Sequence, residues 1–208
     1  MIIPYINNCD NIKFIDSIHE QLPLGMNNDT IYIEPSISEY SMFIPLIERF
    51  KFKNAIINIP DDNLYNVYHQ LKHNVYELIG DLEELYNIHN SLNDAGKIKL
   101  YDGTVDELNN ISTCPILKSI YFIFIHSINT NYVYDRMHIL RINNALTCVH
   151  LKNTNPIDII ISDSNTFYYI CPEVENAALA ANSRFSEFLI SITNLNQKFL
   201  LYSGYKNY

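Results

Sequence analysis

A stripe of apolar residues between residues 62 and 90 limits the possible folds of this chain more than any other feature of its sequence. The residues recur at steps of three and four, as on one face of an α-helix: Leu64, Val67, Leu71, Val75, Leu78, Leu82 and Leu85. They predict one long helix, from about residue 62 to about residue 90, with one face packed against other apolar groups. Two interpretations remain open, a helix that faces the core of its own chain and a coiled-coil contact in a homo-oligomer.

The first 60 residues alternate between the patterns of strands and helices. Strands are expected at 2–6, 30–34 and 54–59, and helices at 10–22 and 38–50, the second with Pro45 as a possible bend. This alternation is typical of a parallel sheet with helices on its faces.

After the long helix, the pattern of the sequence predicts mostly strands joined by turns. Beyond a strand at 97–101 and a short helix at 105–110, the expected strands are 119–127, 137–142, 146–152, 157–162 and 166–171, and a helix at 173–192 closes the chain. We therefore predict an α/β (or α+β) class and a single three-layer domain, 1–208, with a mixed sheet. The sheet is expected to be parallel in the N-terminal half (1–112) and antiparallel in the β-rich C-terminal half (113–208).

Charge and composition narrow the expected partners. The net charge of -9 disfavours nucleic acid and anionic membranes, which leaves a small-molecule ligand or a protein partner. The chain has no apolar run of membrane-spanning length and no secretory signal, so a cytoplasmic location is expected. Abundant Asn, Ile and Tyr indicate an AT-rich genome, such as that of a virus, a phage or some bacteria. If the protein is viral, the expected location is the host cytoplasm. The four cysteines are scattered and are predicted to be buried, reduced thiols.

Few candidate sites emerge from motifs. The five glycines cannot form a Walker loop or a G-x-G-x-x-G loop. His69, His73 and Glu77 have the spacing of metal ligands on a helix, but they lie away from the apolar stripe and are predicted to face solvent. Asp163 and Asn165, at the end of an apolar strand, form either a turn or a pair of oxygen ligands for a divalent cation.

The N-terminal segment Ile2-Ile3-Pro4-Tyr5-Ile6-Asn7-Asn8, followed by Ile12-Lys13 and Ile15-Asp16-Ser17-Ile18, resembles the opening of family 2 glycosyltransferases of the GT-A fold. The resemblance covers about 20 residues. Where that family has an Asp-Asp-Gly-Ser turn after its second strand, this chain has Glu34-Pro35-Ser36, and Asp163-Ser164-Asn165 is the nearest counterpart of its Asp-x-Asp motif.

This resemblance implies a glycosyltransferase-like enzyme, or a nucleotide-sugar binder, that uses Mn²⁺ or Mg²⁺. Pro4 and Tyr5 would hold the nucleoside, and Glu34 would contact the base or the ribose. Asp163 would be the catalytic residue, and it would bind the metal together with Asn165. The alternative is a non-catalytic viral or phage interaction or assembly factor whose contact face is the 62–90 helix.

Overall fold

The computed structural model of the chain describes residues 26–34, 37, 43–110, 112–130, 134–154 and 166–168, the last three by their backbone only. The contacts divide the chain into two compact units. The helical unit comprises the described residues between Asp61 and Thr147, and the sheet unit comprises those before Asp61 and after Thr147. Each unit is described by itself, and the single-domain organisation stays a prediction.

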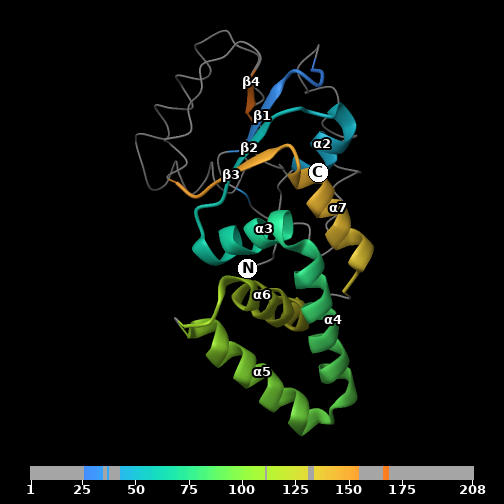
Figure 1. Ribbon diagram of the computed structural model, residues 1–208, viewed down its shortest axis with the longest axis vertical. Coiled ribbons are helices and arrows are strands. Elements are labelled where there is room, and N and C mark those ends of the chain that lie inside the picture. Colours follow the sequence, from blue (N-terminus) through green and yellow to red (C-terminus); the bar gives the residue numbers. More distant parts are fainter. Residues whose placement is uncertain are drawn as a thin grey trace, which may run out of the picture. The chain divides into compact units, whose positions relative to one another are not determined.

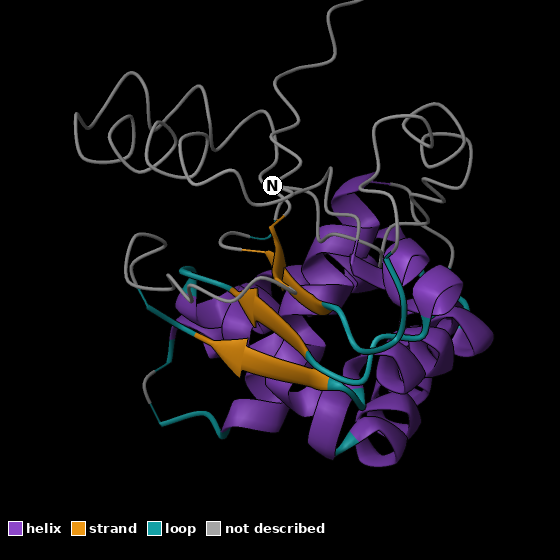
Figure 2. Cartoon of the chain, turned by 90° about the horizontal axis from the view of Figure 1, so that it is seen from above, coloured by secondary structure: helices purple, strands orange, loops and turns teal. Residues whose placement is uncertain are grey.

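The sheet unit is built on four parallel strands, which lie side by side in Figure 2. They are β1 (Ile31–Glu34), β2 (Ala55–Asn58), β3 (Val149–Lys152) and β4 (Thr166–Tyr168). The strand order is β3-β2-β1-β4, and all three pairings are parallel. The predicted strands at 30–34 and 54–59 are therefore confirmed. The predicted antiparallel C-terminal half is wrong for the part of the chain that the structure describes.

Helix α2 (Phe43–Phe50) connects β1 to β2, and its first five residues, 43–47, are all buried. Pro45 is accommodated because it lies in the first turn, where backbone N–H groups have no partner within the helix. The chain leaves α2 through Lys51, which has a φ of 55° and donates its N–H to the carbonyl of Ile47. This left-handed residue ends the helix and directs the chain toward β2.

The helical unit contains five helices (Figure 1): α3 (Asp62–His73), α4 (Val75–Ser91), α5 (Asp94–Asn109), α6 (Pro115–Thr130) and α7 (Arg136–Leu146). All seven residues of the apolar stripe are buried, as expected for a helix that faces its own core. Among the described residues, no helix combines the length and the apolar character needed to cross a membrane.

The predicted long helix is in fact two helices, because the chain bends at Asn74. This residue has φ -133° and ψ 33°, which are not helical values. Its backbone N–H still donates to the Gln70 carbonyl, and its side-chain amide donates to Gln70 Oε1 at 2.6 Å. From α7, the Asn143 side chain donates to the carbonyls of Leu71 and Lys72, at 2.8 and 3.3 Å. Carbonyl groups that the bend leaves without helical partners are thus satisfied by side chains.

Helix α6 is the centre of the helical unit, with contacts to α3, α4 and α5. Its side chains are buried on nearly every face from Ile120 to Ile125. A helix surrounded by other helices is apolar all round and loses its 3.6-residue periodicity. For this reason the predicted strand at 119–127 is wrong. The predicted strands at 137–142 and 97–101 are likewise helical, in α7 and α5.

Several predicted elements lie outside the described residues: the strands at 2–6 and 157–162 and the helices at 10–22 and 173–192. The fold class is corrected accordingly. The described part of the chain is mostly helical, with one small parallel sheet, and it retains only the general α/β character of the prediction.

Candidate functional site

The carboxyl ends of the four strands define the candidate site. Because the strands are parallel, their last residues lie together at one end of the sheet, which we call the carboxyl edge. These residues are Glu34, Asn58, Lys152 and Tyr168. The chain passes from β1 to β2 on one side of β1, whereas β4 pairs with its other side. Open α/β sheets bind ligands outside the carboxyl ends of their strands, at the point where the strand order reverses. In this sheet that point is the end of β1, beside Glu34.

Glu34 is fully buried and is held by a residue of its own strand. The Tyr32 hydroxyl donates to Glu34 Oε2 at 2.7 Å, because residues two apart on a strand share one face of the sheet. The Tyr32 ring stacks on Phe52, with centroids 5.7 Å apart and planes within 2°. Phe52 in turn stacks on Phe50, whose ring lies beneath the Arg49 guanidinium. The carboxylate therefore ends a strand whose aromatic neighbours fix its position.

Asn58 joins the ends of three chain segments at the same edge. Its carbonyl accepts from the N–H of Ile37, which follows β1. Its side-chain amide donates to the Thr154 carbonyl at 2.9 Å, and its Oδ1 accepts from the Thr154 N–H at 3.0 Å. Asn58 is fully buried, so these bonds form away from water and hold the segment after β3 beside the end of β2.

The structure places only one of the predicted site residues. Glu34 lies at the carboxyl edge, whereas Pro4, Tyr5, Asp163 and Asn165 lie outside the described residues. Their predicted roles are tested by nothing in the structure and stay predictions.

The sequence analysis did not identify Asn58 as part of this edge. The available signal was a polar residue after Ala55, Ile56 and Ile57 and shortly before Pro60, where a buried strand ends.

His69, His73 and Glu77 were predicted to face solvent rather than to bind a metal. His73 and Glu77 are exposed and His69 is half-buried, on α3 and α4. No group of three or more His, Cys, Asp or Glu side chains in the described ranges is arranged to hold a metal ion. Cys114 is an exposed free thiol, so the expectation of a buried thiol is wrong there, and Cys148 is half-buried.

The chain is similar to a type II methyltransferase. It is 28% identical to the type II methyltransferase M.MjaIII of Methanocaldococcus jannaschii over 126 residues, which are 59% of this chain and 44% of that protein. The chain thus matches less than half the length of this curated relative. No family model matches the chain.

This similarity overturns the glycosyltransferase assignment, because a methyltransferase transfers a different group from a different donor. The resemblance of the first 20 residues to family 2 glycosyltransferases is therefore not evidence of that activity, and the nucleotide-sugar assignment falls with it. Nothing in the comparison supports a viral or phage origin or an assembly function either.

Proposed function

We propose that the chain is a methyltransferase-type domain and that its sheet unit binds the methyl donor S-adenosylmethionine at the carboxyl edge. The observation that carries this proposal is the reversal of strand order beside Glu34, in a chain with 126 residues similar to a methyltransferase. Such a reversal is where sheets of this kind bind nucleosides and nucleotides.

The chemistry of the donor suits the sequence after β1. Phosphate-binding turns use glycines so that backbone N–H groups can approach the phosphate oxygens. This chain has no glycine between Gly25 and Gly80, a range that includes β1, α2 and β2. S-adenosylmethionine is a nucleoside without phosphate, so the missing glycines do not count against it. A nucleotide-sugar, by contrast, carries a diphosphate, and this segment has no glycine turn that could bind it.

Glu34 offers a carboxyl group to the polar and cationic groups of this donor. When bound, S-adenosylmethionine supplies a methyl group on a cationic sulfur, together with an ammonium group and ribose hydroxyls. A carboxylate at the end of β1 accepts hydrogen bonds from hydroxyl or ammonium groups and attracts positive charge. Because Glu34 is fully buried, the residues that cover it must move before a ligand reaches it. Association slower than for an open site is therefore expected.

The net charge of the chain limits the chemical class of the methyl acceptor but does not identify the acceptor. A net charge of -9 repels polyanions, so a small molecule or a protein is the proposed acceptor. A cytoplasmic location stays part of the proposal. The proposal requires no Mn²⁺ or Mg²⁺, and a metal at Asp163 and Asn165 stays a separate prediction. Self-association through residues 62–90 likewise stays a prediction, although the stripe that suggested it is buried within the chain.

Thermal denaturation of the full chain with S-adenosylmethionine tests the proposal. A ligand that binds only the native state stabilises it by about 2.7 kcal/mol at 100 times its Kd. For a chain of this size, the melting temperature should rise by roughly 5–10 °C. S-adenosylhomocysteine should give a similar rise, and UDP-glucose with Mn²⁺ should give none.

Two variants test the place of binding. Glu34→Gln keeps the acceptor for the Tyr32 hydroxyl but removes the charge, and it should weaken binding by about tenfold or more. Asp29→Asn removes an exposed carboxylate before the opposite end of β1, where it pairs with Lys53, and should leave the affinity unchanged. The proposal fails if millimolar S-adenosylmethionine gives no shift, or if both variants weaken binding equally.

A further inference from the structure

The helical unit contains a cavity of about 560 Å³ that the proposed function does not use. Tyr86 and His89 of α4 line it together with Tyr134, which precedes α7, and with Ile128 of α6. The volume lies within the range of about 300–1,000 Å³ typical of sites for small molecules. All of these residues belong to one unit, so the cavity does not depend on how the two units are placed.

The aromatic walls of the cavity are held in place from behind. The Ser127 hydroxyl donates to the Phe124 carbonyl and therefore accepts the hydrogen bond that joins it to the Tyr86 hydroxyl. The Tyr86 ring meets Phe124 edge-on at 5.4 Å and lies 5.3 Å from the Tyr134 ring. His89 also packs edge-on against Phe124, at 5.5 Å. Because Phe124 is fully buried, these rings have a rigid support.

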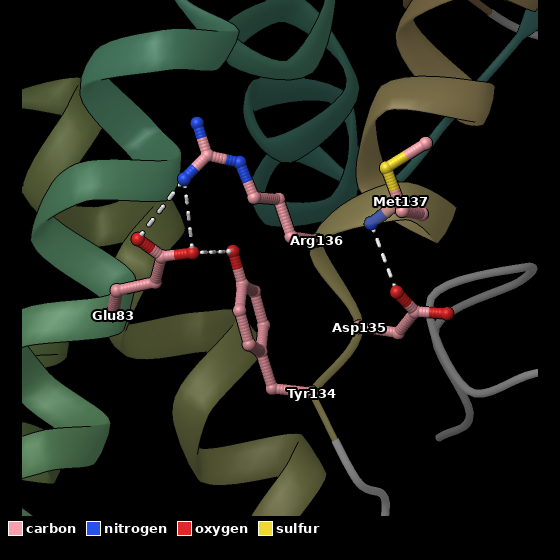
Figure 3. A network of polar contacts seen from close by, with 5 residues as sticks. All are labelled: Glu83, Tyr134, Asp135, Arg136 and Met137. Atoms are coloured by element: carbon pink, nitrogen blue, oxygen red, sulfur yellow. Dashed lines mark hydrogen bonds and ion pairs between the residues drawn. The ribbon is translucent and has the colours of Figure 1, made fainter.

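The Glu83 carboxylate, which also lines the cavity, lies beside Tyr134 (Figure 3). Glu83 projects from α4 toward the segment that leads into α7 and accepts from the Tyr134 hydroxyl at 3.3 Å. The Arg136 guanidinium lies 3.4 and 3.5 Å from its two oxygens. These contacts are long, and the side chains are 36% exposed for Glu83 and 54% exposed for Arg136. Exposed pairs of this kind contribute little stability, so a competing cation can replace the arginine.

The electrostatic environment of the cavity favours positive ligands. Burial and the charge of Glu83 together raise the pKa of the Tyr134 hydroxyl above its usual value. Acidic residues outnumber basic ones between residues 61 and 147. The faces of aromatic rings attract cations through the negative part of their quadrupole. The rings and the Glu83 carboxylate are therefore groups that attract cations.

We propose that this cavity binds an organic cation of the alkylammonium class. The ammonium group lies against the rings of Tyr86 and Tyr134 and beside Glu83, where it takes the place of the Arg136 guanidinium. Asn87 and Asn90, which also line the cavity, offer hydrogen bonds to the rest of the ligand. The cation is either a free small amine or the lysine side chain of a partner protein, because both present the same group.

Calorimetric titration of the full chain with choline tests the ligand class. Its neutral isostere 3,3-dimethylbutan-1-ol has the same shape without the charge. Choline should bind at least about tenfold more tightly, since cation–π and carboxylate attraction both require the charge. Equal affinity for the two compounds, or no binding of choline at millimolar concentration, would overturn the proposal.

Three variants are expected to change the affinity for choline in different ways. Glu83→Gln should weaken choline binding by about tenfold, whereas Arg136→Gln should strengthen it severalfold because the competing cation is gone. Glu84→Gln is the matched control, because Glu84 is the exposed neighbour of Glu83 and does not line the cavity. It should change the affinity by less than about twofold. Weaker binding to Arg136→Gln, or equal losses in the two glutamate variants, would contradict the arrangement.

Two further ligands distinguish the sources of the cation. Spermidine represents free amines, and a short peptide with one trimethyllysine represents a protein partner. Tighter binding of the peptide than of choline assigns the cavity to a protein side chain, and tighter binding of spermidine assigns it to a free amine. In either case Glu83→Gln must weaken the binding, and binding that persists in this variant overturns the proposal.

Discussion

Asn143 is a single side chain whose contribution to stability can be worked out from its contacts. Its amide donates to the carbonyls of Leu71 and Lys72 at the end of α3, at 2.8 and 3.3 Å. Asn143→Ala removes both bonds, with a net loss of roughly 1.5 kcal/mol because the second bond is long. Alanine returns about 0.5 kcal/mol through its higher helix propensity. The free energy of unfolding should therefore fall by about 1 kcal/mol.

The neighbouring Asn144 provides the control for this measurement. It is exposed and lies on the same helix, so Asn144→Ala keeps the propensity gain without losing the two bonds. Its free energy of unfolding should rise by about 0.5 kcal/mol, which places the two variants about 1.5 kcal/mol apart. Urea unfolding followed by far-ultraviolet circular dichroism measures the difference, and the denaturant slopes should agree.

A second substitution tests the polarity of the interaction. Asn143→Asp turns a donor into a carboxylate that faces carbonyl oxygens at the negative end of the α3 dipole. At neutral pH this variant should be less stable than Asn143→Ala, and acidification should reduce the gap as the carboxylate is protonated. If Asn143→Ala is as stable as Asn144→Ala, or the aspartate variant is the more stable of the pair at neutral pH, the reasoning is refuted.

Three further outcomes are expected from denaturation experiments. Lys51→Gly should raise the free energy of unfolding by up to about 1 kcal/mol, because Lys51 has a φ of 55° that glycine adopts without strain; Lys51→Ala should bring no gain. Leu71→Ala should lower it by about 2–5 kcal/mol, since Leu71 is fully buried. The raised pKa of Tyr134 means that its protonated form is favoured in the folded state, so stability should fall as pH rises above about 10; Tyr134→Phe should flatten this fall.

The sequence predicted correctly those helices that have one buried face and one solvent-exposed face. The stripe from Leu64 to Leu85 identified seven buried residues correctly because α3 and α4 each have a solvent face. The same method mistook α6 for a strand, since Ile120 to Ile125 are enclosed by other helices and show no period.

Features that depend on distant partners were not predictable from local patterns. The bend at Asn74 is supported by Asn143, about 70 positions along the chain. Asn58 meets Thr154 at a separation of 96 positions. Glu34 was selected because of a resemblance to glycosyltransferases, whereas its position at the carboxyl edge follows from the strand order.

The pairing of β2 with β3 has a consequence for the order in which the chain folds. Asn58 and Thr154 meet only after a loop of about 96 residues has closed, which for a random chain costs about 4 kcal/mol of entropy. The helices inside that loop make contacts at much shorter separations, so the helical unit is expected to form before the loop closes. Pulse-labelled hydrogen exchange should therefore protect the amides of α6 before that of Thr154. The variant Leu71→Ala, which destabilises the helical unit, should then delay formation of the carboxyl edge, although it removes no contact of that edge.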